Sequence, residues 1–361
     1  MVPVNRPNVR RIATVLGSRD PANPEPRFRL SDGTTVKTTP VFDMYWRFAF
    51  ERQEIFHRRL NGAPWPWTSD PILRTYRFTN AYRAADRVSQ FLIRHVLYEG
   101  EQSAAEVFFR TILFKLFNRI ETWILLRDRV GPLTWKTFRF DRYDTVLASA
   151  LRDGRTVYSP AYIMPTPPFE AKRKHSNHLL LLSHMMKADV PEKIAAAKSL
   201  REIFQILRSF PSLGDFLAFQ YAVDLNYSDL TQFTEMDFVV AGPGARSGIR
   251  KAFADPVELS DEQIIREVTE AADQEFARRG LPFRTLWGRR LHLIDCQNLF
   301  CEIDKYSRVA CPELSGNGRT RIKRKFEPRG TPPSQWYPPK WRLSSPGVNS
   351  RSHLSTSSWT S

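Results

Sequence analysis

The sequence predicts an all-α protein built around one large multi-helix domain. Between about residues 41 and 310, apolar side chains recur at the three- and four-residue spacings of amphipathic helices. No strand-like segments alternate with helical ones, so a parallel α/β sheet is not expected. Hydrophobic residues make up 42% of the 361 residues, and 25 of them are Phe. That is enough apolar surface for a sizeable core without disulfides or metal.

The two ends of the chain differ in composition from its middle. Residues 1–40 are rich in Pro, Arg, Asn and Thr and have no sustained periodicity. Residues 311–361 begin with a basic stretch and continue with proline pairs and a serine-rich run. Both compositions are typical of disorder. We therefore expect a flexible N-terminal arm at 1–40, a helical domain at 41–310 and a disordered tail at 311–361.

The first three helices are expected in the first third of the domain. Apolar spacing predicts a helix at 41–60, ended by Gly62, and a second at 79–98, ended before Gly100. A third is expected from Ser103 toward Gly131, because Ser103 and Glu106 have the spacing of a capping box. This third segment is apolar on nearly every side, which predicts a buried central helix.

Shorter helices follow. We expect them near 141–152, 176–187 and 191–209, then from after 212 to 226, at 260–279 and at 291–306. Ser260 and Gln263 have the spacing of a second capping box. The segment 158–169 holds four prolines and is expected to be a loop.

The charge and cysteine content limit the function classes. Lys and Arg number 54 against 38 Asp and Glu, a formal charge of +16. Such an excess favours a polyanionic partner, DNA first, although an anionic membrane and no polyanion at all stay open. Cys296, Cys301 and Cys311 are too few for a disulfide framework or a four-cysteine metal site. With no apolar leader and no run of 18 apolar residues, we expect an intracellular protein without metal or cofactor.

A glycine-rich motif, VVAGPGARSGI, occupies residues 239–249. In a helix-hairpin-helix such a turn lets the backbone approach a DNA phosphate, and the following helix presents free amides to it. The candidate DNA-binding residues are Gly242, Gly244, Arg246, Gly248, Arg250 and Lys251. The alternative is a glycine-rich helix connection. No Gly-Lys-Ser/Thr ends the run, so it is not a phosphate-binding P-loop.

Polar residues within helical segments mark further candidates. Asn80 and Arg83 would share a helical stripe, with Asp86 three residues after Arg83 and able to hold its guanidinium. Asn118 and Glu121 interrupt the apolar third helix, where unpaired polar groups are costly.

The last motif offers carboxylates for acid–base chemistry. Glu302, Asp304 and Lys305 lie within one turn of the expected final helix. Each of these polar sets has an ordinary alternative, namely a solvated helix face or structural ion pairs.

Five motifs taken together resemble a known family. They are TNAYRAADRVSQ, LFKLFNRIETW, FLAFQYAVDLNYS, VVAGPGARSGIRK and QNLFCEIDKY, in this order over roughly residues 41–310. They resemble the helical domain of 5-hydroxymethyluracil DNA kinases, a family also described as α-glutamyl/putrescinyl thymine pyrophosphorylase-like. The resemblance implies a fold similar to helix-hairpin-helix DNA glycosylases and a role in thymine hypermodification. Kinase members carry a separate P-loop domain, so kinase activity of this sequence alone is not expected.

The resemblance also implies roles for individual residues. The positions expected to be catalytic are Asp86, Glu121, Asp224, Glu302 and Asp304. Those expected to bind substrate are Asn80, Arg83, Asn118, Gln220 and Lys305. A base would have to be flipped out of the duplex to reach them.

Two rival functions stay open, a DNA-binding protein without catalysis and a glycosylase-like enzyme that excises a modified base. A separate kinase is an expected partner, since it would supply the phosphorylated base. The basic run at 319–325 is expected to act as a nuclear localisation signal or as an extra DNA-binding arm. We accordingly expect a nuclear protein.

Overall fold

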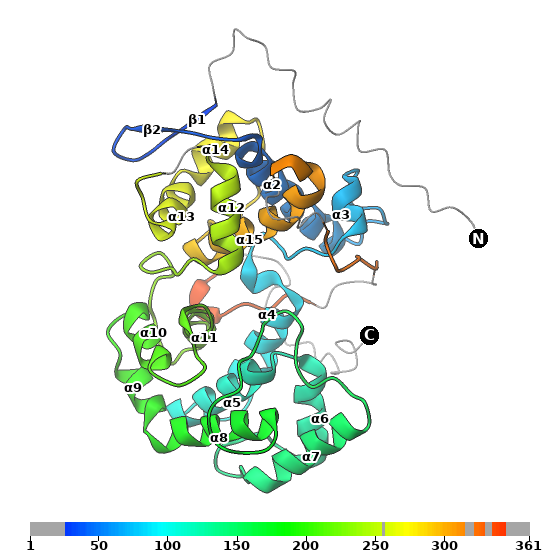
Figure 1. Ribbon diagram of the computed structural model, residues 1–361, viewed down its shortest axis with the longest axis vertical. Coiled ribbons are helices and arrows are strands. Elements are labelled where there is room, and N and C mark those ends of the chain that lie inside the picture. Colours follow the sequence, from blue (N-terminus) through cyan, green and yellow to red (C-terminus); the bar gives the residue numbers. More distant parts are fainter. Residues whose placement is uncertain (1–25, 255–256, 315–320, 329–333, 344–361) are drawn as a thin grey trace, which may run out of the picture. The chain divides into compact units, whose positions relative to one another are not determined.

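The computed structural model describes residues 26–254, 257–314, 321–328 and 334–343. These residues are mostly helical, as expected, and their only strands form one short antiparallel hairpin, β1 (Arg27–Arg29) with β2 (Thr35–Lys37) (Figure 1). The chain forms two compact units. The first contains the described residues of 1–83 and 241–332, and the second those of 84–240 and 333–361.

The first unit is built on α2 (Pro40–Leu60) and α15 (Leu293–Ala310). Its other elements are α3 (Pro71–Thr75), α12 (Pro243–Ala252), α13 (Asp261–Glu270), α14 (Ala272–Arg278) and the 3₁₀ turn η3 (Pro312–Leu314). In α2, the Thr39 side chain accepts a hydrogen bond from the Val41 amide, and Pro40 occupies the first turn, where no amide donor is needed. The predicted capping box of Ser260 and Gln263 is confirmed at the start of α13.

Aromatic rings fill the core of the first unit. Trp46 packs edge-on against Phe42 and Phe276, and Tyr45 packs against Phe300 of α15. Phe28 of the β1–β2 hairpin packs against Phe42 and Phe253, which also contact each other. Helices α12 and α15 lie side by side against this core (Figure 1).

The second unit surrounds α5 (Ala104–Phe117). Its remaining elements are α4 (Arg87–Phe91), the π-helix η2 (Leu92–Leu97), α6 (Ile120–Val130), α7 (Phe140–Arg152), α8 (Lys174–Lys187), α9 (Val190–Ala196), α10 (Leu200–Arg208), α11 (Asp215–Asn226) and the 3₁₀ turn η4 (Pro339–Trp341). Helix α5 contacts η2, α6, α8, α9 and α11, and all but two of its residues are buried. The expectation of a buried central helix at this position is confirmed.

Four helix predictions were wrong in their boundaries. The helix expected at 79–98 is instead a loop, a 3₁₀ turn η1 (Arg83–Ala85), α4 and η2. The helix expected from Ser103 to Gly131 is broken at Asn118, whose φ of 48° is left-handed. The segments at 191–209 and 260–279 are each two helices, broken near Ala197 and Ala271. The proline-rich segment 158–169 contains no helix, as predicted.

The capping box predicted at Ser103 was also wrong. The Ser103 side chain makes no cap hydrogen bond. The Glu106 carboxylate instead accepts hydrogen bonds from the backbone amides of Trp135, at 2.8 Å, and Lys136, at 3.1 Å. Glu106 therefore stabilises the loop after α6 and not the start of its own helix.

Parts of the expected arm and tail have defined positions. Residues 27–37 of the arm form the hairpin, and residues 334–343 belong to the second unit. In the first unit, Arg324 and Phe326 of the tail make backbone hydrogen bonds to Arg77 and Thr75. None of the helices in the described ranges is both long and apolar enough to cross a membrane.

Candidate functional site

A buried ion pair lies in the core of the second unit. Lys115 is near the end of α5, and its Nζ lies 2.9 Å from Oδ2 of Asp224 on α11, with both side chains at most 3% exposed. Lys115 Nζ also donates to Asn118 Oδ1 at 3.0 Å. Two predicted site residues, Asn118 and Asp224, thus meet at a lysine that was not predicted.

Local structure explains why Asn118 lies there. Its left-handed backbone ends α5, and asparagine tolerates this conformation better than most residues. The break lets the chain turn into α6 within two residues. It also leaves the Asn118 side chain one turn from Lys115, within hydrogen-bond distance.

Two tyrosines enclose the ammonium group. Lys115 Nζ lies 5.1 Å from the ring centre of Tyr162 and 5.7 Å from that of Tyr221, so both rings contribute cation–π attraction. The Tyr221 hydroxyl donates to the Lys115 carbonyl oxygen at 3.0 Å. Burial, together with the nearby Asp224 charge, raises the pKa of Tyr221 well above its ordinary value, so it stays a phenol. Predicted Gln220 touches Tyr162 more weakly, with 3.5 Å between the Tyr162 hydroxyl and Gln220 Oε1. We call Lys115, Asn118, Tyr162, Gln220 and Asp224 the Lys115 cluster.

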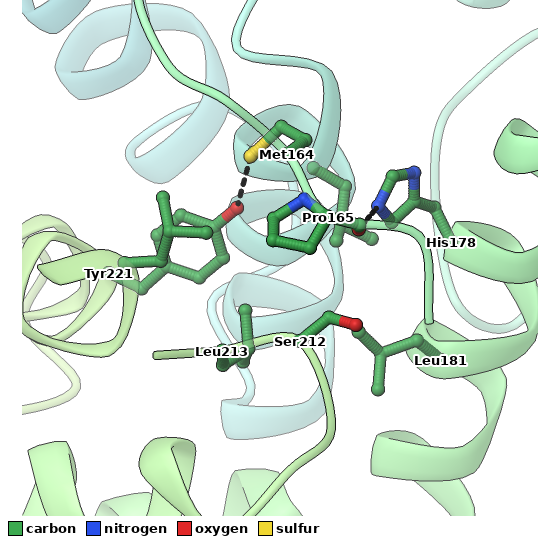
Figure 2. Close-up of a pocket in the computed structure, with 9 residues that line it drawn as sticks. Met164, Pro165, His178, Leu181, Ser212, Leu213 and Tyr221 are labelled. Carbon is green, nitrogen blue, oxygen red and sulfur yellow. Dashed lines mark hydrogen bonds between the residues drawn. The ribbon is translucent and has the colours of Figure 1, made fainter. Parts of the chain in front are cut away.

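A small pocket lies beside the cluster (Figure 2). Tyr221 forms one side, and its hydroxyl lies 3.6 Å from Met164 Sδ. His178 forms another, and it is held by the Pro165 carbonyl at 2.9 Å and the Tyr158 hydroxyl at 2.7 Å. Burial lowers the pKa of His178 to about 4, so the ring is neutral near pH 7. The cavity volume is about 10 Å³, which suffices for about one water molecule and not for a pyrimidine base.

Charged residues lie at the start of α6. Glu121 is 3.7 Å from Arg87 and 3.4 Å from Arg119, and the three side chains are each about one third exposed. The predicted Asp86 is the N-cap residue of α4, and its carbonyl accepts the Gln90 amide at 2.8 Å. We predicted that Asp86 would hold Arg83 because both would lie on one helix. Instead, Arg83 belongs to the 3₁₀ turn η1, which ends at Ala85, and Asp86 precedes α4.

The other predicted carboxylates lie in the first unit, where they support packing. Asp304 accepts hydrogen bonds from Ser247, at 2.7 Å, and Arg308, at 2.5 Å, and pairs with Lys251 at 2.8 Å. Burial disfavours the charged form, but these donors outweigh it and hold the pKa of Asp304 below its ordinary value. Asp304 therefore fastens α12 to α15.

Glu302 and its neighbours are similarly engaged. Its carboxylate contacts Lys305 Nζ at 2.5 Å and accepts the Thr79 amide at 3.2 Å. Asn80 accepts a hydrogen bond from Arg52 at 3.0 Å, and the amide of Arg83 donates to Asp295 at 2.8 Å. These predicted residues lie within the first unit, so the structure does not bring them into the Lys115 cluster.

The glycine motif begins α12, with Gly242 at its N-cap. A Cβ at Gly248 would lie 2.1 Å from the Phe300 carbonyl oxygen, and one at Gly244 would lie 3.1 Å from Cys301 Sγ. Close packing against α15 thus explains both glycines. Arg246, which donates to the Ala241 carbonyl at 3.0 Å, and Arg250 are exposed, and DNA contact by this motif stays a prediction.

Sequence reasoning missed Lys115 and Tyr162 as site residues. The signal for Lys115 was its charge inside the mostly apolar run of residues 107–117, which also holds Arg110, since a buried charge needs a partner. Tyr162 had no comparable signal, because its position over Lys115 depends on the path of a loop. Among the described residues, no group of three or more His, Cys, Asp or Glu side chains is arranged to hold a metal ion.

Fold and cluster together define a helical domain with a buried polar site and an excess of positive charge. The family model described as "5-hmdU DNA kinase, helical domain" matches residues 39–316, and the chain belongs to this family. A curated relative, the 5-hmdU DNA kinase of Bacillus phage SP10, is 30% identical over 290 residues. The match covers 74% of this chain and 45% of the relative, so the chain spans less than half of the relative's length. No solved structure matches.

Proposed function

We propose that this chain is a DNA-binding protein of thymine or 5-hydroxymethyluracil hypermodification, and that a pyrimidine flipped out of the duplex reaches the Lys115 cluster. The observation that carries the proposal is the meeting of Asn118 and Asp224 at Lys115, with Gln220 linked to it through Tyr162. A buried ion pair is a poor stabiliser compared with apolar packing, which favours a functional reason for keeping it. The charge of +16 and the relative's printed name support DNA as the substrate.

Among the candidate carboxylates, Asp224 is best suited to act as the general base. Asp304 has three side-chain partners and a lowered pKa, and Glu302 is held by Lys305 and Thr79. Asp224 lies among polar side chains from α5, α11 and the 158–169 loop, all in one unit. Surrounding amide and ammonium groups can bind the polar edge of a base.

The proposed reaction is displacement at the exocyclic methylene carbon of a phosphorylated or pyrophosphorylated hydroxymethyl pyrimidine. An amine or amino acid nitrogen forms a bond to this carbon, and the C–O bond breaks with its electron pair leaving on the phosphate or pyrophosphate oxygen. Asp224 takes the proton released by the amine. Lys115, or Arg87 and Arg119 beside Glu121, stabilises the departing anion.

The 158–169 loop must move for a base to enter. Tyr162 of this loop covers Lys115, the adjacent pocket holds about one water, and Asp224 is 0% exposed. The next residue, Ile163, is 91% exposed, so this part of the loop is anchored on one side only. Displacing Tyr162 would uncover the ammonium group and make room for the flipped base.

A second candidate function is suggested by the relative, which is named a 5-hmdU DNA kinase. In this case the cluster would present the hydroxymethyl group of the flipped base to a nucleoside triphosphate, and Asp224 would accept the hydroxyl proton. A binder without catalysis and a glycosylase-like excision stay as alternatives. The same proposal includes a fold similar to helix-hairpin-helix glycosylases and DNA contact by Gly242, Arg246 and Arg250. It also includes a separate kinase partner and a nuclear location.

The test is a product assay on DNA with the full chain. Duplexes carrying thymine, 5-hydroxymethyluracil or its phosphomethyl form are incubated with putrescine or glutamate, and separately with ATP, and the nucleosides are measured by mass spectrometry. We expect an amine adduct from the phosphorylated duplex, lost in Asp224→Asn and kept in the control Glu302→Gln. A phosphorylated product from 5-hydroxymethyluracil and ATP would favour the kinase role. No product, or abasic sites only, would contradict both.

A further inference from the structure

A basic surface in the first unit lies outside the elements that carry the Lys115 cluster. It consists of the tail residues 321–326 and residues 74–77, which end α3 and continue just beyond it. We infer that this surface, which we call the basic ridge, binds the phosphate backbone of DNA independently of base modification. The inference rests on the proposed function for the identity of the polyanion, and the experiment below separates the two.

Backbone pairing holds the tail segment in place. The Phe326 amide donates to the Thr75 carbonyl at 2.9 Å, and the Arg77 amide donates to the Arg324 carbonyl at 3.1 Å. These bonds form an isolated antiparallel bridge between Tyr76 and Lys325. Ile322 is 7% exposed, and Phe326 stacks on Trp65 with 5.5 Å between ring centres. Residues 321–326 of the basic run are therefore packed against the first unit. Arg319 and Thr320, which begin the run, lie outside the described residues.

Docking brings cations from two chain segments together. Six exposed side chains carry positive charge on the ridge: Arg74, Arg77, Arg321, Lys323, Arg324 and Lys325. Six cations gathered along two chain segments suit a polymer with a charge on every unit better than a single small anion.

Most of this charge is not neutralised by the protein. Within the part of the chain that the structure describes, no carboxylate forms an ion pair with Arg74, Arg321, Lys323, Arg324 or Lys325. Elsewhere on the same unit, Arg58 pairs with Glu51, Arg284 with Glu54 and Arg290 with Asp273.

Two acidic residues that lie close to the ridge in sequence do little to change this balance. Asp70 is occupied, because its carboxylate caps α3 and accepts the Tyr306 hydroxyl at 2.6 Å. Exposed Glu327 follows the ridge directly and leaves its net charge at +5, six cations less one anion.

The side chains favour nucleic acid over other polyanions. Four of the six cations are arginine, whose planar guanidinium binds phosphate through two parallel hydrogen bonds. Trp65, stacked on Phe326 at one end of the ridge, is 38% exposed and offers an aromatic edge beside the phosphate contacts. Basic rows with adjoining aromatic rings are typical of surfaces that follow a nucleic acid backbone.

The experiment measures the salt dependence of binding to an unmodified duplex. Each phosphate neutralised by a Lys or Arg contributes about 0.9 to the slope of log Kobs against log salt concentration. The full-length triple variant Arg321→Gln, Lys323→Gln and Arg324→Gln should lower the absolute slope by about 2.7, three contacts at about 0.9 each. A second variant, Arg74→Gln, removes one cation from the other segment of the ridge and should lower it by about 0.9.

A matched control removes the same charge elsewhere in the first unit. Arg266→Gln, Arg278→Gln and Arg290→Gln also removes three positive charges, but these arginines pair with Glu270, Glu275 and Asp273. The slope of this control should differ from the wild-type slope by no more than about 0.9, the contribution of one phosphate contact. Equal slope changes in the control and ridge variants would mean that net charge alone matters, and would overturn the inference.

Other outcomes separate the ridge from the proposed function. If the wild type forms the base product but ridge variants keep the full slope, the ridge inference fails alone. If ridge variants lose slope while no modified base is ever formed, the proposed function fails alone. If ridge variants lose binding to phosphatidylserine vesicles and keep binding to the duplex, the ridge is a membrane surface and the inference is overturned.

Discussion

The Lys115–Asp224 pair is the residue-scale feature on which the proposed function depends. Both side chains are at most 3% exposed, and the pair is 2.9 Å apart between α5 and α11. Removing two charges from water carries a large penalty, which mutual attraction and added hydrogen bonds offset only in part. The Asn118 amide oxygen supplies one such hydrogen bond, which accounts for a polar residue at the break between α5 and α6.

The first prediction concerns the stability of this pair. Lys115→Met leaves Asp224 buried without its cation and should lower the free energy of unfolding by about 3–5 kcal/mol. The double variant Lys115→Met with Asp224→Leu removes both charges and should recover most of that loss. Urea denaturation of the three proteins measures the effect. A double variant less stable than the single one would mean that the pair contributes net stability and needs no functional explanation.

Sequence reasoning identified Asp224 as a site residue but not its partner Lys115. Asn118 and Asp224 stood out through motif resemblance, and polar residues in an apolar run are informative because burial demands partners. Lys115 belongs to the same motif, but lysine is normally a surface residue, so periodicity alone does not mark it as buried. Only the packing of α11 against α5 shows that its Nζ meets a carboxylate.

The second prediction concerns pH. In the folded protein burial lowers the pKa of His178 to about 4, whereas in the unfolded chain it is about 6.5. The unfolded chain therefore binds more protons between these values. The contribution of His178 to stability is complete above pH 6.5 and is lost as the pH falls toward 4, at up to about 1.4 kcal/mol per pH unit.

Replacing His178 by Gln keeps a donor for the Pro165 carbonyl and removes the titration. We expect the variant to lose less stability than the wild type between pH 7 and pH 5, measured by urea denaturation at each pH. Burial also lowers the pKa of His175, and burial lowers that of His292 to about 3, so some pH dependence will remain. An unchanged slope would contradict the assignment to His178.

At the scale of elements, the α12–α15 contact organises the first unit. Gly248 lets α12 approach the Phe300 carbonyl, and Asp304 joins the two helices through Ser247 and Lys251. The glycine motif that suggested a phosphate-binding turn therefore also has a packing role. Both readings are compatible, because Gly248 faces α15 whereas Arg246 and Arg250 are exposed.

The third prediction uses the two glycines as a matched pair. In Gly248→Ala the new Cβ would lie 2.1 Å from a backbone oxygen, so α12 must shift, and we expect a loss of about 3 kcal/mol or more. In Gly244→Ala the closest atom is Cys301 Sγ at 3.1 Å, a side chain that can adjust, and the effect should stay within about 1 kcal/mol. Thermal and urea unfolding would measure both. Similar losses in the two variants would argue against close packing at Gly248.

Helix identity was more predictable than helix ends. Apolar periodicity located α2, α7, α8, α11 and α15, because each of these segments buries many apolar side chains at helical spacing. It could not reveal the break at Asn118, since apolar residues continue on both sides and a single left-handed residue leaves no periodic signature. The prediction of a single helix at 79–98 was wrong for a similar reason. Its π-helical turn at η2 keeps apolar side chains buried without the α-helical spacing.

At the scale of the whole molecule, the chain is not divided in sequence order. The first unit combines residues from both halves of the chain, and residues 334–343 return to the second unit. This last segment was expected to be disordered because its prolines and polar residues lack periodicity. Its order depends on tertiary contacts. Trp336 packs on Tyr98 and Trp341 on Tyr227, with ring centres 4.8 and 5.4 Å apart.

Lys340 fixes this segment to the end of α11. Its Nζ donates to the carbonyl oxygens of Asn226 at 2.6 Å, Ser228 at 2.6 Å and Thr231 at 2.7 Å. A cation at a helix C-terminus also interacts favourably with the helix dipole. Asp224 lies two residues before the end of α11, so this contact supports the helix that carries the candidate base.

The fourth prediction follows from this contact. Lys340→Met removes an ammonium group from three carbonyls and should lower the free energy of unfolding by about 2–4 kcal/mol. Lys193→Met is the matched control, because Lys193 is exposed and donates to one carbonyl, that of Ala188 at 2.8 Å. Its loss should stay near 0.5 kcal/mol or less, roughly the effect of a surface substitution. Hydrogen exchange should speed up in residues 226–231 of the Lys340 variant alone. Equal losses in the two variants would show that the tail segment is merely attached to the second unit, whereas a selective loss makes it part of the structure that positions Asp224.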